Sequence, residues 1–228
     1  MQNLTSEDFA NSGLLPADSS AAATTLHLIS GENLADFTNS LSATDQQWLT
    51  RQSFTAKAGQ VAWLENGDGV LGKADADSLA TLGHMPYTLP EGVYRLAEAT
   101  TFIALLGWGL GSYSFSRYKA AERGPAQLIL PDSADAAELI HTVAATYLTR
   151  DLINTPAQDM APSHLQSEVE ALATTFEATV STVVGDELLD LECGAMHAVG
   201  RAADDPPRLM DLTWGDPNHP KITVVGKG

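Results

Sequence analysis

The 228-residue sequence has a single cysteine, Cys193, so no disulfide can form within the chain. No apolar run approaches the roughly 20 residues that a membrane-spanning helix needs. Residues 1–15 include Glu7 and Asp8 but no basic side chain, whereas a secretory signal peptide begins with positive charge. These features predict a protein of the reducing cytoplasm that does not have a membrane as a partner.

Positive charge is also scarce. The sequence has 12 Lys and Arg residues against 29 Asp and Glu residues, which gives a formal net charge of −17. A nucleic-acid-binding surface needs clustered positive charge to neutralise phosphates. The balance therefore predicts that nucleic acid is not a partner, and that the acidic side chains lie on a solvated surface.

What the sequence does contain is a series of short strand-like runs that alternate with helical ones. In the first part of the chain, strands are predicted at 24–30, 59–65, 70–71, 94–97 and 126–131, and helices at 34–48 and 100–119. Asn66-Gly67 and Asp68-Gly69 supply the positive φ angles that a tight β-hairpin turn needs. Gly107, Gly109 and Gly111 each weaken a helix by about 1 kcal/mol relative to alanine. We therefore expect another backbone to pack closely against them.

The second part of the chain continues the alternation. Helices are predicted from an N-cap at Ser133 to Leu152, over 162–173 and over 186–199, and strands over 178–184, 207–214 and 222–225. This order favours an α/β layer architecture. The predicted fold class is α/β. A mixed-sheet α/β domain in residues 1–131 is followed, after a boundary near 131–135, by a linker helix and the beginning of an α/β/α domain in 132–228.

Several candidate motifs are not supported by their residues or by their surroundings. The glycines of 107–111 resemble a dinucleotide-binding loop, but they lie inside a helical pattern. The Gly226-Lys227-Gly228 run is not a phosphate-binding loop, because a lysine stands at the first glycine position and a glycine replaces Ser or Thr. Cys193 and His197 are four residues apart and could share a metal, but without further ligands nearby a structural role is favoured.

Lys227 has two interpretations. It can be an exposed lysine at the end of a strand. Alternatively, burial of that strand end desolvates the amine, which favours the neutral form that can ligate a metal. Ligands of open α/β sheets bind beyond the carboxyl ends of strands. Because the sequence stops at such a point, with no covering helix, it predicts the front part of a larger enzyme.

Several short motifs together resemble the leucyl (cytosol) aminopeptidase family, in that family's order and spacing. They are Arg150-Asp-Leu-Ile-Asn-Thr-Pro156, Met160-Ala-Pro162, Ala198-Val-Gly200, Pro206-Pro-Arg-Leu209 and Val224-Val-Gly-Lys-Gly228. Upstream, Gly111-Ser-Tyr-Ser-Phe-Ser-Arg-Tyr-Lys119 is similar to a helix of the family's N-terminal domain. The sequence departs from the family at Ala202-Ala203, where Gly-Ser is usual, and we expect only a loop effect there.

The resemblance implies a metal-dependent aminopeptidase that releases leucine and other N-terminal residues from peptides with a free N-terminus. Two divalent ions, Zn²⁺ or Mn²⁺, would activate a water and polarise the scissile carbonyl. The resemblance makes Lys227 a ligand of one ion, and places the other ligands and the catalytic residues after this motif. We therefore expect no catalytic residue within these 228 residues, no activity from them alone, and possible absence of bound metal. Family members form hexamers, which implies a homo-oligomer.

A second hypothesis belongs to a different class. In it, the chain is a non-catalytic α/β module that binds a ligand or serves oligomerisation. A third hypothesis is DNA binding, which some family members perform, but the net charge of −17 argues against it.

Overall fold

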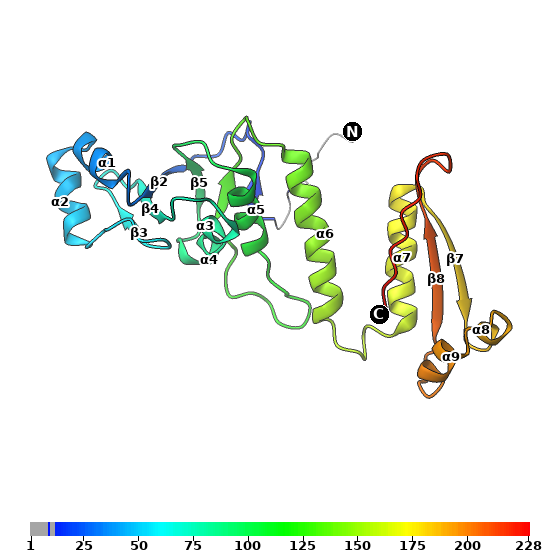
Figure 1. Ribbon diagram of the computed structural model, residues 1–228. Coiled ribbons are helices and arrows are strands. Elements are labelled where there is room, and N and C mark those ends of the chain that lie inside the picture. Colours follow the sequence, from blue (N-terminus) through cyan, green and yellow to red (C-terminus); the bar gives the residue numbers. More distant parts are fainter. Residues whose placement is uncertain (1–8, 10–11) are drawn as a thin grey trace. The chain divides into compact units, whose positions relative to one another are not determined.

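The computed structural model describes residue 9 and residues 12–228. The chain divides into two compact units, one that ends at Arg150 and one that begins at Asp151 (Figure 1). In the described part of the chain, no helix is both long enough and apolar enough to cross a membrane.

The first unit is built on a six-stranded sheet with the strand order β1-β6-β5-β2-β4-β3. Each neighbouring pair is parallel except β3 and β4, which are antiparallel and form the predicted hairpin. The strands are β1 (Leu14–Leu15), β2 (Thr24–Ser30), β3 (Val61–Trp63), β4 (Gly69–Lys73), β5 (Val93–Leu96) and β6 (Gln127–Ile129).

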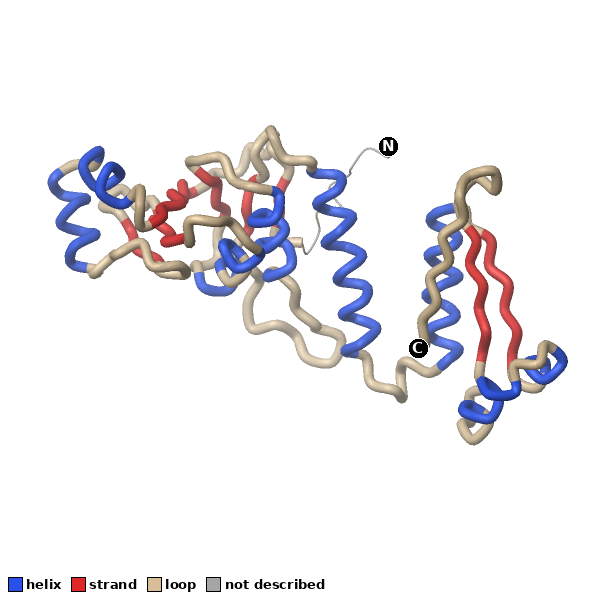
Figure 2. The backbone as a smooth tube through the Cα atoms, in the orientation of Figure 1, coloured by secondary structure: helices blue, strands red, loops and turns tan. Residues whose placement is uncertain are grey.

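Helices cover both faces of this sheet (Figure 2). Successive side chains of a strand point to opposite faces, so Leu28 of β2 joins one buried cluster and Ile29 joins the other. The larger cluster includes side chains of α3 to α6, and the smaller one includes side chains of α1 and α2. The predicted α/β class with a mixed sheet is confirmed. The helices are α1 (Leu34–Ser40), α2 (Ala43–Arg51), α3 (Leu79–Leu82), α4 (Met85–Thr88), α5 (Phe102–Gly111) and α6 (Ala136–Asn154).

The second unit contains a helix packed on a two-stranded antiparallel sheet. Strands β7 and β8 pair from Thr179 opposite Thr213 to Val184 opposite Arg208. Helix α7 contacts both strands, and α8 and α9 follow β7. The elements are α7 (Pro162–Phe176), β7 (Thr179–Val184), α8 (Glu187–Asp190), α9 (Gly194–Gly200) and β8 (Arg208–Thr213).

The glycines of α5 bring its backbone against the short helix α3. A Cβ atom added at Gly107 would collide with the carbonyl oxygen of Leu79, and one added at Gly111 would collide with that of Gly83. The expected close approach of another backbone is therefore confirmed. The glycines also lie inside a helix, as expected for a packing role.

Two helices predicted from their periodicity have different boundaries in the structure. The predicted helix 34–48 is two helices, because Ser42 has an extended ψ of 156° and its hydroxyl oxygen accepts a backbone N–H of α2 at 3.1 Å. The predicted helix 100–119 ends at Gly111. The apolar spacing beyond that point was misleading, because Tyr113 packs edge-on against α6 instead of continuing α5.

Two further details of the predicted helices are wrong. The N-terminal cap of α6 is Asp135 rather than Ser133, since Asp135 Oδ1 accepts the N–H of Glu138 at 3.0 Å. The predicted helix 186–199 is divided into α8 and α9. Glu192, between them, has a φ of +58°, a left-handed conformation that an α-helix does not contain.

Replacement of Gly107 by alanine is expected to destabilise the first unit. The new methyl group would overlap the Leu79 carbonyl oxygen. Such overpacking costs about 1–3 kcal/mol, which exceeds the ~1 kcal/mol that alanine adds to helix stability. The measurement is urea unfolding followed by the fluorescence of buried Trp108. Gly31→Ala is the control, because no atom lies within 4 Å of a Cβ there; equal losses in both variants would contradict the packing account.

A partly buried charge pair extends the contact between β2 and β5. Beyond Leu26, where their ladder ends, the N–H of Leu28 donates to Glu98 Oε2 at 2.9 Å. Glu98 Oε1 lies 3.0 Å from His27 Nδ1. This hydrogen bond raises the pKa of His27 and outweighs the opposing effect of burial. Burial favours a higher pKa for Glu98, but the hydrogen bonds from His27 and Leu28 and the charge of His27 together lower it.

The contribution of this pair to stability is expected to depend on pH. The His27 contribution is present below its unfolded pKa of 6.5 and is lost as pH rises through the raised folded value. The Glu98 contribution is present above 4.5 and is lost as pH falls through the lowered folded value. The free energy of unfolding of the wild type should therefore exceed that of Glu98→Gln most between pH 4.5 and 6.5. The difference should be at most about 1 kcal/mol, because the pair is partly exposed. Urea unfolding at several pH values measures the difference, and a constant difference would disprove the ion pair.

Candidate functional site

Lys227 lies in an extended segment rather than at the end of a buried strand. Within the described chain, residues 222–225 pair with no strand, and Ile222, Val224 and Val225 are 89–90% exposed. The predicted strand 222–225 is therefore wrong for this structure, because a strand forms only where a neighbouring edge supplies hydrogen bonds. The Lys227 amine is exposed and donates to the Gly228 carbonyl oxygen at 3.0 Å.

The described residues do not by themselves fit a metal centre. In the part of the chain that the structure describes, no group of three or more His, Cys, Asp or Glu side chains could hold an ion. His197 Nε2 instead lies 2.9 Å from Asp186 Oδ1, and Cys193 Sγ lies 3.5 Å from the carbonyl oxygen of Leu191. One lysine alone does not make a dinuclear site.

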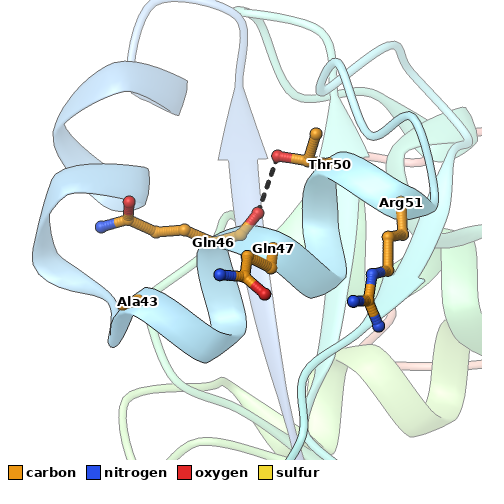
Figure 3. A pocket seen from close by; sticks show the side chains of 5 residues that line it. All are labelled: Ala43, Gln46, Gln47, Thr50 and Arg51. Atoms are coloured by element: carbon orange, nitrogen blue, oxygen red, sulfur yellow. Dashed lines mark hydrogen bonds between the residues drawn. The ribbon is translucent and has the colours of Figure 1, made fainter.

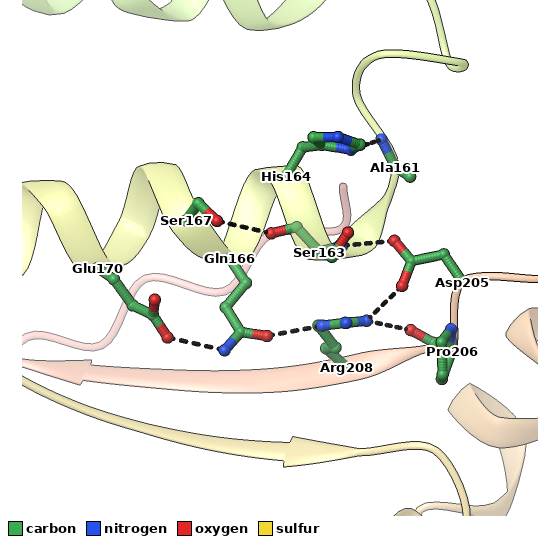
Figure 4. A network of polar contacts seen from close by, with 9 residues as sticks. All are labelled: Ala161, Ser163, His164, Gln166, Ser167, Glu170, Asp205, Pro206 and Arg208. Carbon is green, nitrogen blue, oxygen red and sulfur yellow. Dashed lines mark hydrogen bonds and ion pairs between the residues drawn. The ribbon is translucent and has the colours of Figure 1, made fainter.

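A polar cluster joins the start of α7 to the start of β8 (Figure 4). Arg208 is its centre, with a side chain that is 12% exposed. Its Nε donates to Gln166 Oε1 at 2.6 Å, and its Nη1 donates to Asp205 Oδ1 at 2.8 Å and to the Pro206 carbonyl oxygen at 2.7 Å. Gln166 in turn donates to Glu170 at 2.7 Å, so the guanidinium is linked to two successive turns of α7.

Asp205 also caps α7 from a distant part of the sequence. The N-cap residue of this helix, Ala161, has no side-chain acceptor for the free N–H groups of the first turn. Asp205 Oδ2 accepts the N–H of Ser163 at 2.7 Å. Hydrogen bonds from the Ser163 backbone and hydroxyl lower the pKa of Asp205 and outweigh the opposing effect of burial, and the charge of Arg208 lowers it further. The carboxylate is thus held in its charged form.

This cluster connects motifs that are far apart in the sequence. Residues 160–162 lead into α7, and residues 206–209 contain Arg208. Gly228, next to Lys227, lies against the side chain of Leu165 in the same first turns of α7. The sequence drew attention to 160–162 and 206–209, but gave no signal that Asp205 and Gln166 were their partners.

A shallow pocket lies on the surface of α2 (Figure 3). Its lining residues come from this one helix, and the Thr50 hydroxyl donates to the Gln46 carbonyl oxygen at 2.8 Å. The other lining residues are Ala43, Gln47 and Arg51. No acid, histidine or cysteine is among them, so the pocket supplies no group for acid–base or metal chemistry.

Two family models match successive parts of the chain. The model for the M17 aminopeptidase N-terminal domain matches residues 24–131, and the model for the catalytic domain of the cytosol aminopeptidase family matches residues 147–228. The chain belongs to the cytosol aminopeptidase family. The resemblance inferred from the short motifs is therefore confirmed.

Known members of the cytosol aminopeptidase family agree in sequence and in fold. The cytosol aminopeptidase of Pseudomonas aeruginosa is 31% identical in an alignment 171 residues long, which covers 69% of this chain and 34% of that protein. The crystal structure of the Coxiella burnetii cytosol aminopeptidase is 32% identical, with a TM-score of 0.82 over 91% of this chain and 47% of that one. The leucyl aminopeptidase of Trypanosoma cruzi has a similar fold, with a TM-score of 0.63 at 16% identity over 93% of this chain and 52% of that one. The chain spans about a third of the curated relatives' length.

Replacement of Arg208 by glutamine is expected to loosen α7 from β8. The variant loses the charged donor to Asp205, and hydrogen bonds to charged groups contribute about 1.5–3 kcal/mol. The second unit should lose stability of that order, and the Ser163 amide should exchange faster with solvent deuterium. Arg201→Gln, at an exposed arginine of the same unit, is the control. If both variants behave alike, the cluster does not stabilise the unit.

Proposed function

We propose that this chain provides the N-terminal domain and the first part of the catalytic domain of a metal-dependent aminopeptidase. The enzyme would release leucine and other N-terminal residues from peptides that have a free N-terminus. The observation that carries the proposal is the match of both family models, in the order N-terminal domain then catalytic domain. The 32% identity to a solved cytosol aminopeptidase supports it.

The proposed domain division is 1–131 for the N-terminal domain, and 132–228 for the linker helix and the first part of the catalytic domain. The N-terminal family model ends at residue 131, which supports this division. Helix α6 would then be the linker. In the structure the first unit extends to Arg150, and Leu139 and Ile140 from the first half of α6 belong to its buried cluster.

We propose Lys227 as the one metal ligand that this chain supplies. In the full enzyme two divalent ions, Zn²⁺ or Mn²⁺, would supply an activated water and polarise the peptide carbonyl. Because the described residues do not form a metal centre, the remaining ligands would have to lie outside them. The structure of the bottromycin maturation enzyme BotP, a protein of similar fold, is known in complex with Mn, which makes Mn²⁺ a reasonable first choice for assays.

We further propose that the enzyme is cytoplasmic and forms a hexamer. The name cytosol aminopeptidase, carried by the relatives, supports the location. A second candidate function is a non-catalytic α/β module for ligand binding or oligomerisation, which would also account for the lack of a metal-binding cluster among the described residues.

The test compares the 228-residue chain with a protein of the relatives' length that contains it, on a leucyl anilide with Mn²⁺. Only the longer protein should turn over the substrate. In that protein, Lys227→Met should reduce the rate and the metal affinity at least about 100-fold, because even changes to residues outside the ligand shell reduce them roughly 10–100-fold.

Lys221→Met, at an exposed lysine six residues upstream, is the matched control. Bound metal is measured by elemental analysis, independently of the rate. Equal turnover by the 228-residue chain would favour a different active site. Full metal content and full rate in Lys227→Met would remove Lys227 from the site.

A further inference from the structure

We propose that Asn66 is a site of spontaneous deamidation in the folded protein. Asn66 and Gly67 lie in the turn between β3 and β4, and both are exposed. Theirs is the only Asn-Gly step in the sequence. Asparagine is a thermolabile residue, and its side-chain carbonyl can react with the backbone nitrogen of the residue that follows it.

Gly67 leaves this nitrogen accessible. Its φ is +90°, and no atom outside residues 66–68 lies within 4 Å of the position that a Cβ would occupy. Glycine is favoured at such an angle because it has no side chain to collide with the backbone. The same lack of a side chain leaves room for a five-membered ring between Asn66 and Gly67.

Hydrogen bonds within the turn orient the Asn66 side chain for attack by the Gly67 nitrogen. The N–H of Asp68 donates to Asn66 Oδ1 at 3.0 Å, which folds the carboxamide back over the intervening Gly67 peptide. This donation also draws electrons from the carbonyl carbon Cγ. Asn66 Nδ2 donates to Asp68 Oδ2 at 2.8 Å, so the nitrogen that leaves is held beside a carboxylate. The opposing contact is the Gly67 N–H donation to the Leu64 carbonyl oxygen at 3.1 Å, which has to open.

The reaction needs only water. The Gly67 nitrogen attacks Asn66 Cγ, so that an N–Cγ bond forms and the Cγ–Nδ2 bond breaks. The proton of the Gly67 amide is transferred to the leaving nitrogen, which departs as ammonia. Water then opens the succinimide at either carbonyl and gives aspartate or isoaspartate at position 66, with no change in oxidation state.

Isoaspartate would disturb the hairpin. It routes the backbone through the side-chain carbon and adds one atom to the turn that the Leu64 N–H closes on the Asp68 carbonyl oxygen at 2.8 Å. The neighbouring pair of Trp63 and Gly69 ends the β3–β4 ladder. Because β3 is a three-residue edge strand, few hydrogen bonds hold it in register. The product also adds a negative charge close to Asp68.

The test is incubation of the folded 228-residue chain at mildly alkaline pH, followed by peptide mass spectrometry and isoaspartate-specific methylation. The early gain of mass should map to the peptide that contains Asn66. This gain of mass and the release of ammonia that accompanies it should be lost in Asn66→Gln. Asn218 is the matched internal control: it is exposed and donates to the Asp216 carboxylate, but histidine follows it.

Two results would overturn the proposal. One is equal or faster modification of Asn218 or of other asparagines in the folded chain. The other is modification of Asn66 in urea together with none in the folded chain, because the turn would then protect the residue.

Discussion

One carboxylate, that of Asp205, satisfies two electrostatic requirements of the second unit. The first turn of α7 has free N–H groups, and its N-cap alanine cannot accept them. The guanidinium of Arg208 is largely removed from water and needs acceptors nearby. Asp205 accepts from the Ser163 N–H with one oxygen and from Arg208 with the other. The contact of α7 with β8 therefore depends on Asp205 together with Arg208, the centre of the polar cluster.

In the first unit, side chains of α6 likewise satisfy the free backbone groups at a helix end, here the carbonyl groups at the end of α5. Glycines let α5 approach α3, and the last carbonyl groups of α5 then need donors. The Tyr147 hydroxyl donates to the Gly109 carbonyl oxygen at 2.6 Å, and Arg150 Nη1 donates to that of Leu110 at 2.6 Å. Burial is the main cause that raises the pKa of Tyr147, so it stays a neutral donor. Arg150 also places a cation at the negative end of α5.

The catalytic-domain match covers α7, the two-stranded sheet of β7 and β8, and Lys227. Its described residues supply a well-connected helix and sheet, but no cluster of metal ligands. What this part contributes to the family's architecture is therefore the anchored helix α7 and the segment that carries Lys227.

The sequence alone determined the features that neighbouring residues decide. It specified the strand Thr24–Ser30, the hairpin turn at 66–69 and the close packing at the glycines of α5, because turn geometry and the lack of a Cβ act locally. Its motifs also indicated the family and, through that resemblance, made Lys227 a candidate metal ligand. Only the tertiary structure decided the pairing of Leu14 with Leu128, the cap that Asp205 gives to α7 and the unpaired state of 222–225. Each of these depends on whether a distant segment supplies the missing hydrogen-bond partner, and no local pattern encodes that.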